Sequence, residues 1–179
     1  MQFVDNATPR PTTFCGVSRG PSAQGTAEYN VAWSRLLAAI DAYLVAHRWE
    51  NKGYYYVQNE PQGGSDYEVA AFLANLTKSA APHLRIAISE EPKPEIVDHP
   101  SSQGHGYDLW WANLSEFDRA YPNPPRSGAL SYAAQRQLRG EDVWWYFLYG
   151  DKPPHFNPVT IDHPGIESRI PFWAAWKYR

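Results

Sequence analysis

The segment Asn59-Glu60-Pro61 places an amide, a carboxylate and a proline directly after residues 54–58, a run of tyrosines with a valine. Tyr and Val favour β-strands, so this run predicts a buried strand that delivers Glu60 to its end. Pro61 then restricts the backbone that leaves the strand. A glutamate in a partly apolar, aromatic pocket has a raised pKa and can act as a general acid near neutral pH. The alternative is that Glu60 caps the next helix or pairs with an arginine.

The elements that would position such a glutamate alternate along the chain. Apolar runs predict strands at 12–17, 54–58, 84–89, 107–113 and 141–149. Helical spacing of apolar residues predicts helices at 26–50, from Ser65 or Asp66 to just before Pro82, and at 114–121, 129–139 and 165–178. Alternation of this kind indicates an α/β fold with a parallel sheet and right-handed crossovers. About five units fall short of the eight in a (β/α)8 barrel, which leaves an open sheet or a partial TIM barrel.

The carboxyl ends of parallel strands meet at one edge, where α/β proteins place their chemistry. The segments expected at this edge are Ser18-Arg19-Gly20, Asn59-Glu60, Glu90-Glu91, Ala112-Asn113 and Gly150-Asp151-Lys152. The strands that end there also carry Trp110, Trp111, Trp144 and Trp145. Because side chains alternate along a strand, only one member of each tryptophan pair can face a site. We expect Glu60 to lie at the end of a central strand of this sheet.

The composition favours a carbohydrate ligand. Eight Trp and twelve Tyr can stack on the apolar face of a pyranose, although they suit an aromatic core equally well. The net charge of −3 comes without a basic patch, which argues against nucleic acid. No apolar run approaches the roughly 20 residues of a membrane span, and the first residues lack the features of a signal peptide. The compartment is therefore unknown.

Neither a metal site nor a cofactor is predicted. Cys15 is the only cysteine, which excludes an internal disulfide and a thiolate zinc site. Four histidines lie in predicted loops close to aspartates, but their spacing is not that of metal ligands: His99, His105, His155 and His163.

Motifs in the order of the chain resemble the catalytic domain of glycoside hydrolase family 123, the β-N-acetylgalactosaminidase-like barrels. Asn59-Glu60-Pro61 is similar to the Asp-Glu-Pro that ends a strand in that family. The segment "YDLWW" is similar to a Val-Asp-x-Trp segment of that family. The segment "GEDVWWYFLYGDKPPHFNP" is similar to its Gly-x-x-x-Trp-x-Tyr strand with the following loop. The segment "IESRIPFWAAWKY" is similar to its helix ending Trp-Lys-Tyr. The likeness implies that residues 1–179 form a single domain, an incomplete (β/α)8 barrel without the N-terminal strands and the last strand.

This resemblance implies hydrolysis of 2-acetamido-2-deoxy-β-galactosides or glucosides by a substrate-assisted retaining mechanism, in which the acetamido oxygen attacks the anomeric carbon. Glu60 would protonate the leaving oxygen. Asn59, where the family has Asp, would orient the acetamide but supply no negative charge. Further substrate-binding residues are expected at Trp110, Trp111, Trp144, Trp145, Tyr146, Glu90, Glu91, Asp108 and Asn157. The partners implied are a carbohydrate substrate and the missing part of the chain's own barrel.

Two other functions remain open. In a two-carboxylate retaining glycosidase Glu60 would be the acid/base and Glu90 or Glu91 the nucleophile, with the two carboxyl groups about 5 Å apart. In a non-catalytic carbohydrate-binding protein, an eroded barrel, no residue would act on the sugar. Asn59 and the missing strands favour this last possibility.

Overall fold

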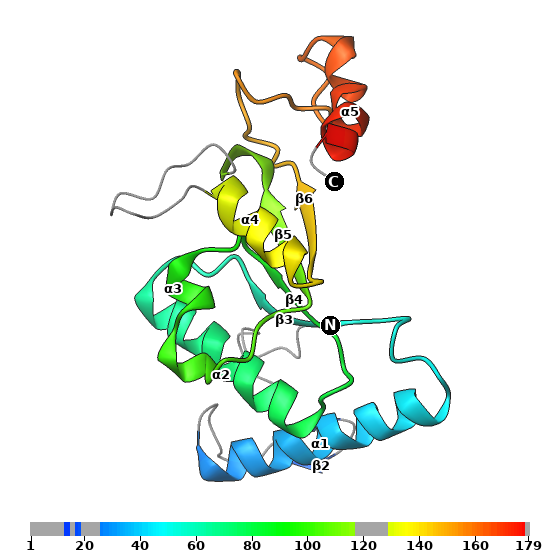
Figure 1. The fold of residues 1–179 in the computed structure, drawn as a ribbon, viewed down its shortest axis with the longest axis vertical. Coiled ribbons are helices and arrows are strands. Elements are labelled where there is room, and N and C mark those ends of the chain that lie inside the picture. The colour runs from blue at the N-terminus through cyan, green and yellow to red at the C-terminus, as the bar shows by residue number, and fades with distance from the viewer. Residues whose placement is uncertain (1–12, 15–16, 19–25, 117–128, 178–179) are drawn as a thin grey trace. The chain divides into compact units, whose positions relative to one another are not determined.

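The computed structural model describes residues 13–14, 17–18, 26–116 and 129–177 (Figure 1). The chain divides into two compact units. Unit 1 comprises Met1–Ile88 and Pro94–Asp108, and unit 2 comprises Ser89–Lys93 and Leu109–Arg179.

Helices and strands alternate along most of the described chain. Up to residue 102 the elements are β1 (Thr13–Phe14), β2 (Val17–Ser18), α1 (Ala27–Ala46), β3 (Tyr55–Asn59), α2 (Gly64–Ala80), β4 (Ile86–Ser89), α3 (Pro94–Val97) and the 3-10 turn η1 (Pro100–Ser102). They are followed by β5 (Leu109–Asn113), η2 (Leu114–Glu116), α4 (Ala129–Leu138), β6 (Asp142–Tyr146), η3 (Gly165–Ser168) and α5 (Ile170–Lys177).

The main sheet is parallel, with four strands in the order β3-β4-β5-β6. This confirms the predicted parallel α/β fold. The expectation of five strands is wrong for the described residues, because those of the segment 12–17, Thr13, Phe14 and Val17, do not join this sheet. They contribute instead to an antiparallel pair, in which Thr13 pairs with Ser18 and Phe14 with Val17. The expectation that Glu60 follows a central strand is also wrong, since β3 is an outer strand in this order.

In unit 1, α1 contributes one narrow stripe to the core. Thr26 caps the helix, where its hydroxyl accepts a hydrogen bond from the backbone N–H of Tyr29 at 3.3 Å. Leu37 is buried against Ala81 and Leu84, which lie between α2 and β4. Figure 1 shows α1 beside α2. Several apolar side chains that the spacing assigned to the buried face are exposed instead, including Leu36, Ile40 and Tyr43.

A polar contact fastens α1 to the loop before β4. Asp41 is buried, and its carboxylate accepts hydrogen bonds from the backbone N–H of His83 at 3.1 Å and from His83 Nδ1 at 3.0 Å. A buried carboxylate needs such partners, because desolvation otherwise makes its charge costly. The contact therefore sets where α1 lies along the end of α2 and the following loop.

Helix α2 and strand β4 supply many of the buried residues of unit 1. Three alanines and a leucine of α2 are buried, and their small side chains allow neighbouring backbones to approach closely: Ala70, Ala71, Leu73 and Ala74. All four residues of β4 are buried, as is usual for an inner strand of a parallel sheet. Asp66 lies in the first turn of α2, where a carboxylate stabilises the helix dipole; the residue that caps the helix is Gly63 rather than the predicted Ser65 or Asp66.

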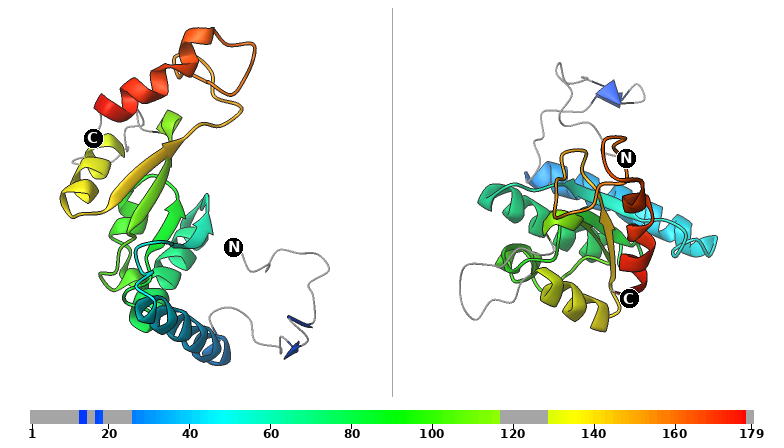
Figure 2. Two further views of the ribbon diagram at one scale, coloured as in Figure 1. Left: turned by 90° about the vertical axis from the view of Figure 1, so that its right-hand side faces the viewer. Right: turned by 90° about the horizontal axis from the view of Figure 1, so that it is seen from above.

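In unit 2, β5 and β6 pair in parallel, with Trp110 opposite Val143, Trp111 opposite Trp144 and Asn113 opposite Tyr146. Helix α4 packs beside β6 (Figure 2). The helix buries Ala129, Ala133 and Arg136, which recur at helical spacing.

The C-terminal helix differs from its prediction. Of the helix predicted at 165–178, the described residues 165–177 form the 3-10 turn η3 and then α5, separated at Arg169, rather than one helix. Pro171 has no backbone N–H to continue hydrogen bonding from the preceding turn, which explains the break. Helix α5 buries no residue, and Phe172, Trp173 and Trp176 are exposed. Of the helix predicted at 114–121, residues 117–121 lie outside the described residues.

None of the described helices is long and apolar enough to cross a membrane.

The burial of Leu37 gives a matched test of this core. Leu37 is 2% exposed, whereas its neighbour Leu36 is 42% exposed. We expect Leu37→Ala to lower the free energy of unfolding by about 2–4 kcal/mol, since a cavity remains. The same change at Leu36 should cost less than about 1 kcal/mol. Urea denaturation of both variants measures the difference, and equal losses would contradict the assigned face of α1.

Candidate functional site

The carboxyl end of β3 presents Asn59 and Glu60 as predicted. Tyr56 donates its hydroxyl hydrogen to Asn59 Oδ1 at 2.7 Å, which orients the exposed amide. Glu60 follows with a backbone φ of 39°, in the left-handed region that residues other than glycine seldom adopt. Backbone strain of this kind costs about 1–3 kcal/mol and is concentrated at functional sites.

Neighbouring bonds maintain this conformation of Glu60. The carbonyl oxygen of Glu60 accepts a hydrogen bond from Gln62 Nε2 at 2.9 Å. The backbone N–H of Gln62 donates to Asp66 Oδ2 at 3.0 Å, in the first turn of α2. Pro61 between them is fully buried. The turn from β3 into α2 is thus held by its own side chains, and Glu60 is delivered in a defined position.

A second group of charged residues follows β4. Glu90, Glu91 and Lys93 are all buried. Lys93 Nζ forms ion pairs with both carboxylates, with Glu90 and, at 2.7 Å, with Glu91. Lys93 was not singled out from the sequence, although its position directly after two glutamates and a proline was the available signal. One ammonium can balance only one of two buried carboxylates.

The protonation of this group follows from that imbalance. Burial first, and then the hydrogen bond and negative charge of Glu91, raise the pKa of Glu90 to about 8, although Lys93 acts to lower it. Burial acts in the same direction on Glu91, but the hydrogen bond from Glu90 and the charge of Lys93 lower its pKa overall. Burial lowers the pKa of Lys93, yet Glu91 and Glu90 together raise it. At neutral pH the group is a protonated Glu90, an ionised Glu91 and an ammonium.

Strand alternation separates the tryptophan pairs. Trp110 has no exposed surface; its indole N–H donates to Glu141 Oε2 at 2.7 Å, and the guanidinium of Arg136 lies 5.9 Å from the centre of its ring. Arg136 Nε donates to the same carboxylate at 2.7 Å. A ring enclosed in this way offers no face to a sugar, so the expectation that Trp110 binds substrate is corrected. It packs β5 against α4.

The opposite face of β5 and β6 carries the remaining candidates. The rings of Trp111 and Trp144 are stacked, with centroids 6.4 Å apart and planes 14° from parallel. Trp144 is 52% exposed, and Tyr146 follows two residues later on the same face. Trp145 points the other way and makes edge contacts with Phe147 and Phe156. The structure therefore brings Trp111, Trp144 and Tyr146 together and separates them from Trp110 and Trp145.

Asp108 lies at the opposite end of the strands from the predicted edge. It precedes β5, and its Oδ2 accepts hydrogen bonds from the backbone N–H of Ile86, at the start of β4, at 2.7 Å, and from Lys78 Nζ at 2.6 Å. Its role is to join the amino-terminal end of β4 to the end of α2. The resemblance implied that Asp108 binds substrate, but its carboxylate is instead engaged by Lys78 and the backbone of Ile86.

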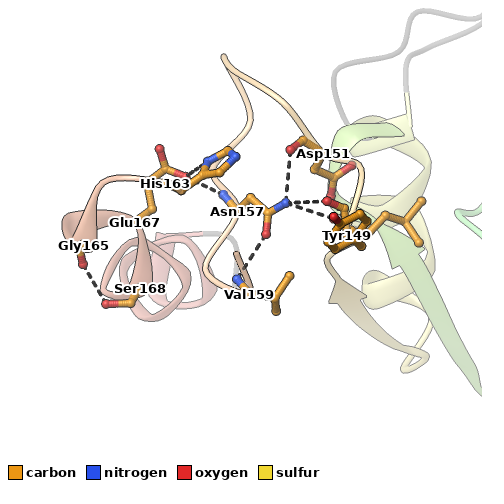
Figure 3. A network of polar contacts seen from close by, with 9 residues as sticks. Tyr149, Asp151, Asn157, Val159, His163, Gly165, Glu167 and Ser168 are labelled. Carbon is orange, nitrogen blue, oxygen red and sulfur yellow. Dashed lines mark hydrogen bonds and ion pairs between the residues drawn. The ribbon is translucent and has the colours of Figure 1, made fainter. Parts of the chain in front are cut away.

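Asn157 is fully buried and holds the loop after β6 together (Figure 3). Its side-chain N–H groups donate to the carbonyl oxygens of Leu148, Tyr149 and Asp151, and its Oδ1 accepts from Val159 N–H at 3.1 Å. Its own backbone N–H donates to Glu167 Oε2 at 2.6 Å. Every polar group of this side chain is engaged within the loop, so the expected substrate contact of Asn157 is corrected to a structural role.

Glu167 also holds His163, a pair that the sequence reading missed. His163 Nδ1 lies 2.8 Å from Glu167 Oε2. The two residues are four apart in sequence, with His163 just before η3 and Glu167 within it. The hydrogen bond from the backbone of Asn157, with smaller effects of His163, lowers the pKa of the Glu167 carboxyl.

Within the described residues, no group of three His, Cys, Asp or Glu side chains could hold a metal ion. Arg19 and Gly20, expected at the carboxyl edge, lie outside the described residues. The chain matches no family model and no curated protein.

The state of Glu90 predicts how stability depends on pH. The native state keeps a proton that the unfolded chain releases above its ordinary pKa of 4.5, so the free energy of unfolding falls as pH rises from about 4.5 to about 8. Glu91 and Lys93 add nothing in this window, because each is charged in both states. We expect a loss of up to about 5 kcal/mol in the unmodified chain, since each unit of pKa difference corresponds to about 1.4 kcal/mol.

Glu90→Gln should remove most of this loss, because a neutral amide replaces the neutral acid at every pH. The matched control is Glu95→Gln, a change of the same type at an exposed residue nearby. Urea denaturation across this pH range measures both. A Glu90→Gln variant with the same pH dependence as the unmodified chain would show that Glu90 is ionised in the native state.

Proposed function

We propose that the chain is a glycoside hydrolase acting on 2-acetamido-2-deoxy-β-galactosides or the corresponding glucosides, with the substrate's acetamido oxygen as nucleophile. The observation that carries the proposal is the arrangement of Tyr56, Asn59 and Glu60 at the carboxyl end of β3. It combines a carboxyl group at a strand end with an amide held at a defined angle.

Glu60 is the proposed general acid. Protonation of the leaving oxygen needs a carboxyl group whose position is maintained while the bond to the sugar breaks. The left-handed backbone of Glu60 and the bonds of Gln62 and Asp66 around it supply that rigidity. A strained residue that serves only to close a turn would more often be glycine or asparagine.

Asn59 is the proposed partner of the acetamido group. Its Oδ1 has two lone pairs, and Tyr56 uses one of them. The second can accept the N–H of the acetamide, which orients its oxygen toward the anomeric carbon. An amide offers a dipole where a carboxylate offers a charge, so the positive charge that develops on the acetamide is less well stabilised. We therefore expect the enzyme to hydrolyse its substrate slowly.

An aromatic surface within unit 2 supports a carbohydrate ligand. Trp111 and Trp144 form a stacked pair whose outer ring is half exposed, and they lie on the face of β5 and β6 opposite Trp110 and α4. In a (β/α) barrel the helices cover the outer face, so this surface corresponds to the inner one. A partial TIM barrel, completed by further strands as partner, belongs to the same proposal.

We rank the two-carboxylate mechanism lower because neither Glu90 nor Glu91 is suited to be its nucleophile. Glu90 is protonated at neutral pH, and a nucleophile must be ionised. Glu91 is ionised, but it is 2% exposed and paired with Lys93. A non-catalytic carbohydrate-binding protein remains the alternative that a kinetic test decides.

Substitutions at Asn59 and Glu60 test the proposal with an aryl 2-acetamido-2-deoxy-β-galactoside. We expect weak hydrolysis by the unmodified chain. Asn59→Asp should raise the rate by about 100-fold, because it restores one charge interaction in the transition state. Glu60→Gln should abolish hydrolysis of substrates with poor leaving groups and spare an activated aryl substrate, whose leaving group needs no protonation.

Glu68→Gln is the control, since it makes the same change at an exposed residue of α2. If Asn59→Asp has no effect while a sugar with a plain 2-hydroxyl is cleaved well, the acetamide mechanism is wrong and two carboxylates act. If no variant hydrolyses any glycoside although sugars still bind, the chain is a binding protein.

A further inference from the structure

Helix α1 exposes a stripe of large apolar side chains. Leu36, Ile40 and Tyr43 are 42%, 37% and 54% exposed. They follow one another at spacings of four and three residues, so they lie on one face of the helix. This α1 stripe lies next to the narrow face on which Leu37 packs into the core of unit 1. The core therefore covers only part of the apolar surface that α1 carries.

The side of α1 that carries the stripe has almost no charge to favour contact with water. Between residues 36 and 46 the only charged residue is Asp41, which is buried. Glu28 and Arg35 are the only other charged residues of the helix. A helix face that is open to solvent is ordinarily polar, and contiguous exposed apolar surface marks a contact with another molecule.

The spacing of the stripe favours a second helix as the partner. Apolar residues at alternating spacings of four and three repeat every 3.5 residues on average, which is the period with which two helices pack side by side. Exposed alanines at intervals of seven residues lie beside the stripe: Ala32, Ala39 and Ala46. Small side chains at these positions allow the axis of a second helix to come close.

The stripe matches itself when a second copy of α1 runs in the opposite direction. The three large side chains are centred between residues 39 and 40, and a twofold axis at this point makes the contact symmetric. Ile40 of each copy then faces Ala39 of the other, and Leu36 lies in one layer with Tyr43 of the other. Large side chains thus meet small ones at the centre, as close packing requires.

The charges at the two ends of α1 favour the same direction. Glu28 lies in the first turn, whereas Arg48 and Lys52 follow the last turn and are exposed. Glu50, which lies between them, is half-buried. An antiparallel pair brings Glu28 of each copy to the basic end of the other and sets the two helix dipoles against each other. A parallel pair would instead bring like charges together at both ends.

We propose that α1 is a self-association surface, through which two copies of this chain form an antiparallel helix pair about a twofold axis between residues 39 and 40. The symmetric contact uses the α1 stripe, the alanines beside it and the charged ends of the helix twice. This inference does not depend on hydrolysis at Glu60, because neither Glu60 nor Asn59 belongs to α1.

Sedimentation velocity of the full chain at several concentrations tests the proposal. We expect a reversible equilibrium between monomer and dimer. Ile40→Glu places two carboxylates beside the axis and should raise the Kd of the dimer by about 100-fold. Leu138→Glu is the matched control, because it makes the same change at an exposed residue of α4 and should leave the Kd unchanged. Circular dichroism and urea denaturation check that both variants fold.

A charge exchange tests the pairing of the helix ends. Glu28→Lys should raise the Kd of the dimer by about 2- to 10-fold, since each copy then presents a lysine to the basic end of the other. Adding Arg48→Glu to the same chain should lower the Kd again, because the two ends regain opposite charges. A second substitution that weakens the dimer further overturns the antiparallel arrangement.

Cysteine cross-linking tests the direction independently. Cys15, the only cysteine of the chain, is first replaced by serine. In the antiparallel pair Ala39→Cys lies beside its counterpart in the second copy and should form an interchain disulfide on oxidation. Ala32→Cys lies roughly 22 Å along the helix axis from its counterpart and should remain reduced. Cross-linking of Ala32→Cys would show a parallel pair and overturns the proposed arrangement.

Two results identify a different occupant of the stripe or a different contact. A dimer that persists in Ile40→Glu but is lost in Trp176→Glu assigns the contact to the exposed rings of α5 and overturns the proposal. A chain that is monomeric at every concentration also overturns it. If Ile40→Glu then lowers the free energy of unfolding while Leu138→Glu does not, the stripe is covered within a single chain.

Discussion

The parallel register of β5 and β6 determines which tryptophans of these strands are buried and which are exposed. Trp111 lies opposite Trp144, and alternation then places Trp110 and Trp145 on the other face. Helix α4 covers one face. Its residue Arg136 forms a hydrogen bond with Glu141, which also accepts the indole N–H of Trp110. A slip of one residue would expose Trp110 and bury Trp144, so the ion pair and the exposed stack depend on the same pairing.

The strand ends show two solutions for placing carboxyl groups. After β3, the turn residues hold Glu60 by backbone bonds, and its neighbour Asn59 stays exposed. After β4, two glutamates are buried together and need Lys93 and a retained proton to be tolerated. Buried charges must be neutralised by a partner or by protonation, and here both occur in one group. The first arrangement fixes the backbone around Glu60, whereas the second neutralises its charges within the group.

The periodicity and composition of apolar residues were sufficient to predict the strands of the main sheet and the long helices. Apolar runs and helical spacing reflect local backbone preference and burial together. The residues 54–58 and 84–89 indeed contain most of β3 and β4. The hydrogen-bond and ion-pair partners of individual side chains could not be predicted from these patterns. Asp108 was predicted near the start of its strand, as observed, but the pattern did not show that an aspartate there accepts a hydrogen bond from the backbone of a neighbouring strand.

The same limit applies to Asn157 and Lys93. An asparagine in a proline-containing loop looks like a ligand contact in sequence, but the loop folds back so that three carbonyl oxygens meet its amide. Lys93 was passed over because burial cannot be read from a single charged residue among prolines. Residue type thus identified polar side chains, and long-range geometry decided which of them bind one another.

The bare aromatic surface of α5 has a practical consequence for handling the protein. Phe172, Trp173 and Trp176 expose large rings to water within eight residues. Salts that are excluded from protein surfaces, such as sulfate, strengthen the tendency of such rings to leave water. Concentrated stocks in ammonium sulfate should therefore scatter light before those in sodium chloride of equal ionic strength, and replacing these rings with polar residues is the first change to make for crystallisation.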